Sequence, residues 1–234
     1  MDPALIKSFE KKYNAQVKEF FFETDEIKEG LLLESKGKGY DVVLSSGIRI
    51  PHYIKQNWLA KISQSQIPNL KHIDAQWRKI RPEIADFVVP YLWGTCGIAC
   101  RKDLVKKEIT SWLELYRPSE DLKGKILMIN DSHEAVGLGL KALGYSLNSE
   151  DKHQYDQVRD LLLQQKPYVY DYSYVAVNPQ SSLVTGEIWM AMVYNGDGLM
   201  LQELHPQIAF VIPREGTSLW VDYLLIMEQS ANKE

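Results

Sequence analysis

The 234-residue chain is 45% hydrophobic and 25% charged, with a formal net charge of −4. Its length suits one large α/β domain or two ordinary lobes, and the composition predicts a globular core rather than disorder. The mildly acidic balance argues against bulk nucleic-acid binding, which normally requires a basic face.

The first third of the chain alternates helix and strand patterns. Asp2 and Pro3 are typical of an N-cap and a first-turn proline, and apolar residues then recur at helical spacing. The elements that follow are expected as a strand at 17–22, a helix at 25–35, a strand at 42–44 and a helix at 50–56. Such a series predicts a parallel sheet flanked by helices.

The alternation resumes after a proline-interrupted stretch at 63–90. The expected strands lie at 94–101, 125–129, 188–193, 208–212 and 220–226. The expected helices lie at 111–116, at 131–143 (closed by Gly144) and at 151–164. The sequence therefore predicts two α/β segments followed by a last strand.

The sequence shows neither a membrane span nor an export signal. No run approaches the ~18–20 apolar residues that cross a bilayer, and residues 1–5 lack the basic and apolar regions of a signal peptide. We therefore expect no direct membrane insertion, and either a cytoplasmic protein or an exported one whose signal has been removed.

The two cysteines are predicted to be inert thiols. Cys96 and Cys100 lie four residues apart in an expected strand, which separates their Cα atoms by roughly 13 Å, too far for a disulfide. Their spacing differs from the CxxC of metal or redox sites, and the histidines show no metal-binding pattern. We expect no metal site and no cofactor.

Six segments stand out by their order and spacing. They are Gly39-Tyr40-Asp41-Val42-Val43, Val89-Pro90-Tyr91-Leu92-Trp93-Gly94-Thr95, Thr110-Ser111-Trp112-Leu113-Glu114-Leu115, Leu140-Lys141-Ala142-Leu143-Gly144-Tyr145-Ser146, Tyr194-Asn195-Gly196-Asp197, and Pro213-Arg214-Glu215-Gly216 with Trp220-Val221-Asp222. Together they resemble the polyamine-binding receptors, of the spermidine/putrescine class, of bacterial ABC transporters. One such segment would be a weak signal, whereas six in register cover nearly the whole chain.

This resemblance implies the α/β fold of a type II periplasmic binding protein, in which two lobes of mixed sheets flanked by helices enclose a cleft. It divides the chain into lobe one at 1–93, lobe two at 94–211 and a return segment into lobe one at 212–234. Compared with the family, the chain is expected to lack the first strand, the aromatic loop after it and the C-terminal helices of lobe one.

The resemblance also implies a ligand site. A polyamine carries ammonium groups on a methylene chain, so its binder requires carboxylates for the charges and aromatic faces for the methylenes. The positions that match the family's ligand contacts are Asp131, Glu134, Tyr194, Trp220 and Asp222, and possible cleft or hinge positions are Ser46 and Trp93.

Each of these residues has an ordinary structural alternative. Asp131 and Glu134 also form a capping-box pattern at a helix start. Trp220 and Asp222 alternate along a strand and so share a face, but such a strand can simply be half-buried. Tyr194 could belong to the core and Trp93 to a hinge or the core. For Asp197, we expect a helix N-cap more than a charge in the site.

The run Gly47-Ile48-Arg49 departs from the family, which often supplies aromatic residues after the position of Ser46. A cationic Arg49 facing the ligand would repel an ammonium group. Either this side chain points to solvent, or the amine lies elsewhere, or the ligand preference differs.

Two functions fit this reading: a periplasmic receptor that delivers a polyamine to an ABC-transporter permease, or a polyamine sensor for a membrane signalling partner. Binding of another cationic small molecule stays open. No hydrolase, phosphate-binding or dinucleotide motif is present, and aromatic residues beside acids suit cation binding better than acid–base catalysis. We therefore expect no enzyme and no catalytic residue.

Overall fold

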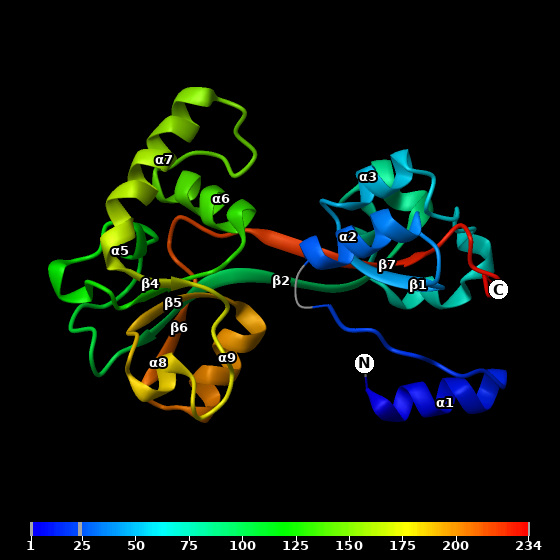
Figure 1. The fold of residues 1–234 in the computed structure, drawn as a ribbon, viewed down its shortest axis with the longest axis horizontal. Helices are drawn as coiled ribbons and strands as arrows, with labels where there is room; N and C mark the ends of the chain where they lie inside the picture. The colour runs from blue at the N-terminus through cyan, green and yellow to red at the C-terminus, as the bar shows by residue number, and fades with distance from the viewer. Residues whose placement is uncertain (1, 23–24, 234) are drawn as a thin grey trace. The chain divides into compact units, whose positions relative to one another are not determined.

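The computed structural model describes residues 2–22 and 25–233, and the chain divides into two compact units. The first unit comprises Met1–Pro90 with Tyr223–Glu234, and the second comprises Tyr91–Asp222. Two strands, β2 (Val88–Arg101) and β7 (Leu219–Ile226), contribute residues to both units (Figure 1). The lobe boundaries expected from the sequence remain a prediction about the functional lobes.

The first unit pairs β1 (Val42–Ser46) with β7 and surrounds them with helices. Its α-helices are α1 (Pro3–Tyr13), α2 (Asp25–Ser35), α3 (Ile50–Lys55) and α4 (Ala75–Lys79), and its 3₁₀ helices are η1 (Gln64–Gln66), η2 (Pro68–His72) and η3 (Pro82–Phe87). Leu32 and Ile50 are almost completely buried, so α2 and α3 supply its core.

The strand expected at 17–22 is wrong. These residues carry no strand assignment, although the helix before them forms as predicted, with the Asp2 carboxylate accepting a hydrogen bond from the Ala4 N–H at 2.8 Å. No described residue of α1 is buried, and its apolar side chains Leu5, Phe9 and Tyr13 are exposed. An apolar pattern forms a strand only when a neighbouring strand completes its hydrogen bonds.

The second unit is built on five strands in the order β6-β2-β5-β3-β4. β2 runs antiparallel to β5 and β6, whereas β3 runs parallel to β5 and β4. The bounds of the remaining strands are β3 (Ile126–Met128), β4 (Val169–Tyr172), β5 (Met190–Tyr194) and β6 (Ile208–Val211). Opposite Tyr194, the last residue of β5, stands Cys96 of β2.

Helices cover both faces of this sheet (Figure 1). One face packs against α5 (Leu113–Tyr116), α6 (Ser132–Ala142) and α7 (Lys152–Gln165), and the other against α8 (Ser182–Thr185) and α9 (Asn195–Leu204). Two further 3₁₀ helices are η4 (Glu120–Leu122) and η5 (Lys166–Tyr168). The alternation of β2 explains both layers, since Ile98 joins one core and Ala99 the other.

Both cysteines are buried free thiols, as the sequence predicted. Burial raises the pKa of Cys100 to about 11, and it raises the pKa of Cys96 well above its usual value, with a further contribution from the nearby Glu134 carboxylate. Neither thiol is therefore a ready nucleophile or metal ligand.

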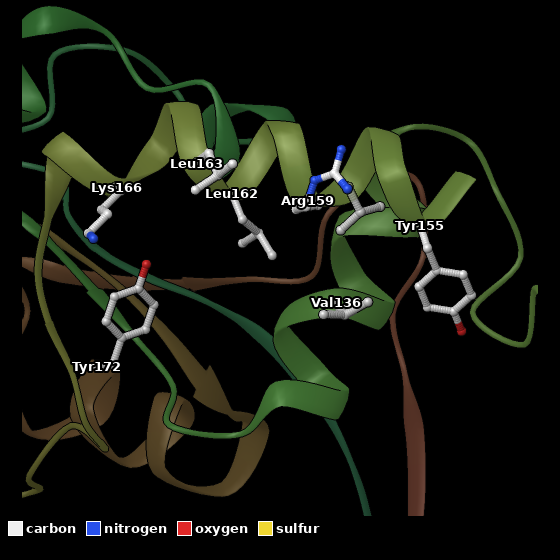
Figure 2. A pocket seen from close by; sticks show the side chains of 8 residues that line it. Val136, Tyr155, Arg159, Leu162, Leu163, Lys166 and Tyr172 are labelled. Atoms are coloured by element: carbon white, nitrogen blue, oxygen red, sulfur yellow. The ribbon is translucent and has the colours of Figure 1, made fainter. Parts of the chain in front are cut away.

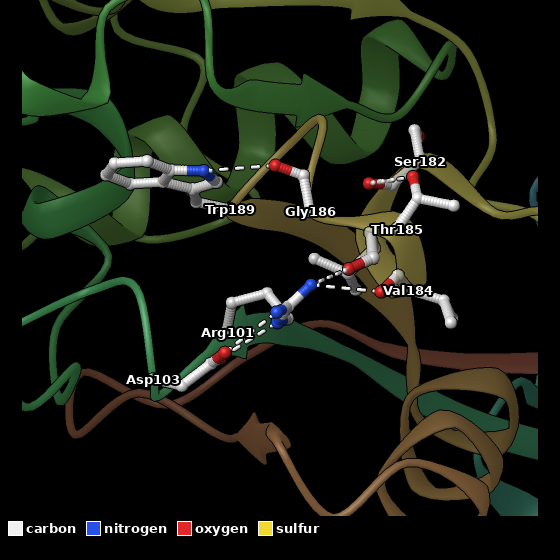
Figure 3. A network of polar contacts seen from close by, with 8 residues as sticks. Arg101, Asp103, Ser182, Val184, Thr185, Gly186 and Trp189 are labelled. Atoms are coloured by element: carbon white, nitrogen blue, oxygen red, sulfur yellow. Dashed lines mark hydrogen bonds and ion pairs between the residues drawn. The ribbon is translucent and has the colours of Figure 1, made fainter.

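Arg101, the last residue of β2, forms hydrogen bonds with α8 (Figure 3). The Nη1 group of Arg101 donates to the carbonyl oxygens of Leu183 and Val184 at 3.2 and 3.0 Å, while its Nε and Nη2 groups bind Asp103 at 2.8 and 2.7 Å. These bonds satisfy carbonyl groups of the short helix α8 and fix its place beside the sheet.

Candidate ligand-binding site

Asp131 caps helix α6. It lies between β3 and the helix, and its Oδ1 atom accepts hydrogen bonds from the backbone N–H groups of His133 at 2.9 Å and Glu134 at 3.1 Å. Asp131 is thus a helix N-cap, the structural role considered for it above. Only half of a capping box forms, because the Glu134 side chain accepts its hydrogen bond from Ser218. Asp131 remains half-buried beside Glu134.

Glu134 is a buried acid that forms no ion pair among the described residues. Its side chain is only 6% exposed, its Oε2 atom accepts a hydrogen bond from the Ser218 hydroxyl at 2.7 Å, and no basic side chain in the described part of the chain forms an ion pair with it. Burial raises the pKa of Glu134, and the neighbouring Asp131 carboxylate raises it further, against the opposing effect of the Ser218 hydrogen bond. Interaction with the nearby His133 side chain lowers this pKa to a smaller extent.

Ser218 was not among the residues predicted from the sequence. It is placed by the segment 213–218, which is tied to the second unit at several points. The Arg214 N–H donates to the Thr110 carbonyl at 2.9 Å, the Trp112 indole N–H donates to the Gly216 carbonyl at 2.8 Å, and the Thr217 hydroxyl donates to the Cys96 carbonyl. Because these partners lie far away along the chain, no local sequence pattern indicates the role of Ser218.

Tyr194 lies between two aromatic rings. Its ring centroid is 5.6 Å from that of Trp220 in an edge arrangement and 5.7 Å from that of Tyr174 in a tilted one. Burial raises the pKa of Tyr194, followed by the effects of the Glu134 and Asp131 carboxylates. The structure therefore brings four of the predicted residues, Asp131, Glu134, Tyr194 and Trp220, into one neighbourhood of the second unit.

Trp220 and Asp222 occupy the same face of β7. Both are half-buried, whereas Val221 and Tyr223 between and after them are buried, as strand alternation requires. The Trp220 indole lies directly against the backbone of Gly94, where a Cβ atom would overlap it. Its Nε1–H group is buried and has no hydrogen-bond partner among the described residues. An unpaired buried donor is rare and suggests a missing acceptor.

The expected helix-capping role of Asp197 is wrong. Helix α9 begins two residues earlier, at Asn195, so Asp197 lies in its first turn and accepts a hydrogen bond from the Tyr174 hydroxyl at 2.5 Å. The Asn195 side chain binds the Thr95 N–H at 3.0 Å and so joins the start of α9 to β2.

The remaining predicted positions have different surroundings. Ser46 ends β1 in the first unit and is half-buried. Arg49 forms an ion pair with Glu29 within that unit, with 2.9 Å between Nη1 and Oε2, so its charge is partly compensated there. Trp93 is 54% exposed, which contradicts the core packing considered for it.

A separate pocket of about 370 Å³ lies beside α6 and α7 (Figure 2). Its lining is mostly apolar and includes Val136, Leu162 and Tyr172. None of the residues that line it belongs to the predicted ligand site.

The sequence model of the family described as bacterial extracellular solute-binding protein matches residues 4–234. The chain belongs to this family. The Spermidine/putrescine-binding periplasmic protein of Escherichia coli (strain K12) is 29% identical over 234 residues, which are 99% of this chain and 66% of that protein. The Norspermidine sensor of Vibrio cholerae serotype O1 is 27% identical over 232 residues, 98% of this chain and 63% of that protein.

A solved relative of this solute-binding protein shows the same fold. The spermidine/putrescine ABC transporter substrate-binding protein PotD from Streptococcus pneumoniae superimposes with a TM-score of 0.81 at 24% identity, covering 100% of this chain and 71% of that one. The predicted α/β fold of a type II periplasmic binding protein is thereby confirmed. The chain spans roughly two thirds of these relatives, which are binding proteins rather than enzymes.

The described ranges 2–22 and 25–233 lack two other features. No helix there has the length and apolarity of a membrane span. No group of three or more histidine, cysteine or acidic side chains there is arranged to hold a metal ion.

Proposed function

We propose that this solute-binding protein binds a polyamine of the spermidine/putrescine class, with Asp131, Glu134 and Asp222 facing ammonium groups and with Tyr194 and Trp220 contacting methylenes. The observation that carries the proposal is Glu134, a buried carboxylate that forms no ion pair among the described residues and lies near the Tyr194 ring. An ammonium group would compensate this charge, and the aromatic faces would attract both the cation and its methylenes.

The unpaired Trp220 N–H fits the same proposal. An indole N–H is only a donor, so it cannot bind an ammonium group, but it can bind a carboxylate that ligand binding reorients. A bound cation would also offset the burial that chiefly raises the pKa of Glu134, together with the smaller repulsion from the Asp131 carboxylate.

For the physiological role, we favour delivery of the polyamine to an ABC-transporter permease in the periplasm. The curated relative named above as periplasmic and the solved relative named as a transporter component support this choice. The sensor role is the second candidate, supported by the relative named as a norspermidine sensor. Both roles require the same ligand site, so binding is the first property to test.

The substitution Asp222→Asn tests the proposal directly. It preserves the size of the side chain and removes its charge, so we expect spermidine binding to weaken by about 2–4 kcal/mol, since truncating one partner of a desolvated charge pair typically costs ~2–5 kcal/mol. The measurement is a calorimetric titration, with circular dichroism to show that the fold is intact.

Asp160→Asn provides the control. Asp160 is an exposed acid on α7 in the same unit, and within the described part of the chain it forms an ion pair with Arg159 alone. Its loss lowers the net negative charge equally, so it should leave the affinity unchanged. Equal affinities for Asp222→Asn and wild type would remove Asp222 from the site, and with it much of the case for a cationic ligand.

A further inference from the structure

Tyr174 contacts Tyr194, one of the residues of the candidate site. It follows β4 in a run of alternating tyrosines at 168, 170, 172 and 174, and its ring packs against Tyr194 with centroids 5.7 Å apart and planes inclined by 31°. Its hydroxyl makes two hydrogen bonds, accepting from the Tyr194 N–H at 3.3 Å and donating to Asp197 Oδ2 at 2.5 Å.

These two bonds join the end of β5 to the first turn of α9. A phenol has a single proton to donate, and here that proton goes to a carboxylate. Tyr194 is the N-cap residue of α9 but makes no side-chain cap, so Tyr174 supplies the contact that fixes both the Tyr194 backbone and the Asp197 carboxylate. Burial and the bond to Asp197 both raise the pKa of Tyr174, so its hydroxyl remains a donor throughout the physiological range.

The rotation of Asp197 is thereby restricted. With Oδ2 held by Tyr174, the other oxygen, Oδ1, takes part in no hydrogen bond with the described residues. The charge also lies at a helix N-terminus, where the backbone dipoles favour an anion. Asp197 is therefore a fixed acid three residues after Tyr194, bound to the same Tyr174 hydroxyl that accepts from the Tyr194 N–H.

Building on the proposed polyamine site, we propose that Tyr174 is a positioning residue that sets the preference among polyamines of different length. Its hydroxyl fixes the distance at which the Asp197 carboxylate stands from the Tyr194 ring. Spermidine and putrescine carry their ammonium groups at different spacings, so they depend differently on an acid held at one point. Tyr174 itself does not touch the ligand.

The test is Tyr174→Phe, which keeps the ring stacking and removes the hydroxyl. We expect its Kd for spermidine to rise roughly tenfold or more, as when a hydrogen bond to a charged group is lost, and the ratio of spermidine to putrescine affinity to change. Tyr170→Phe is the matched control, because the Tyr170 hydroxyl donates to Glu187 Oε1 at 2.8 Å in the same alternating run. That variant should change neither quantity.

A double-mutant cycle with Asp197→Ala distinguishes positioning from general support. If Tyr174 acts through Asp197, Tyr174→Phe will change the affinity much less in the Asp197→Ala background than alone. Additive effects, or a parallel loss for both ligands, would contradict the proposal. Thermal melts of all variants without ligand show whether each variant folds. If Tyr174→Phe does not fold, Asp197→Ala alone still tests whether the Asp197 carboxylate affects the affinity for the two polyamines.

Binding by the wild-type chain distinguishes a failure of the proposed function from a failure of the role proposed for Tyr174. A wild-type chain that binds neither spermidine nor putrescine contradicts the proposed function itself. A wild-type chain that binds both, with Tyr174→Phe and Tyr170→Phe indistinguishable, contradicts only the role of Tyr174.

Discussion

Burying the Glu134 carboxyl has an energetic cost. The pKa of this carboxyl is raised above the ordinary value of 4.5, chiefly by burial. A raised pKa means that the folded chain prefers the protonated acid. The contribution of Glu134 to stability is therefore greatest below the ordinary pKa and is lost as the pH rises through the pKa in the folded chain.

Glu134→Gln should remove this loss of stability at higher pH. The amide keeps an oxygen that can accept the hydrogen bond from Ser218 while carrying no charge, so the unliganded variant should melt above wild type at neutral pH. The two should melt alike below pH 4.5, where the acid is protonated in both states. Thermal melts across this pH range check the prediction, and a variant less stable than wild type at neutral pH would contradict it.

At the residue scale, the sequence predicted a set of acids and aromatic rings, four of which lie in one neighbourhood of the second unit, but it did not indicate the residues that support them. The spacing of Asp131 and Glu134 at a helix start, and the alternation of Trp220 and Asp222, are local patterns that periodicity reveals. Ser218 and Tyr174 act through partners far along the chain, Glu134 and Asp197. Contacts of that kind depend on the fold and cannot be read from neighbouring residues.

Helix α6 combines a structural and a proposed binding role in its N-cap. Asp131 caps α6 and Asp151 caps α7 in the same way, each accepting a hydrogen bond from the N–H two residues later, at 2.9 and 2.8 Å. Asparagine caps helices about as well as aspartate. The two positions therefore form a natural pair for separating capping from ligand binding.

Asp131→Asn should weaken polyamine binding, whereas Asp151→Asn should not. Both variants should melt close to wild type, because each keeps its cap and loses the same favourable charge at a helix N-terminus, ~0.3–1 kcal/mol. Titrations and melts of the two proteins check this directly. Equal affinities would leave Asp131 as a cap alone.

At the element scale, most helices and strands follow from periodicity and end signals. Asp2, Gly144 and Asp151 mark helix ends as expected, and Gly144 adopts a positive φ of 83° after α6. The segment 17–22 fails because alternation alone cannot provide a partner strand. The start of helix α9 was expected after Asp197 rather than at Asn195, because its first turn, Asn195-Gly196-Asp197-Gly198, contains residues that usually break helices.

For the whole molecule, periodicity predicted an α/β protein, and the sheet of the second unit explains why, whereas the type II binding-protein class was implied by the family resemblance. Parallel strands covered on both faces require apolar runs between helices, which is the pattern the sequence carries. Periodicity predicted the last strand but could not indicate to which unit it belongs. β7 delivers Trp220 and Asp222 to the second unit and Tyr223 to the first, and only the resemblance to a known family anticipated a returning segment.

The central claim is that this chain binds polyamine cations, and one measurement tests it most directly. The wild-type chain is titrated calorimetrically at neutral pH with spermidine, putrescine, norspermidine, arginine and thiamine. We expect saturable one-to-one binding of at least one polyamine, with affinity falling as the pH is lowered through the pKa of Glu134, because protonation removes the charge that the ammonium group binds. No polyamine binding, or binding of arginine or thiamine in preference to every polyamine, would contradict it.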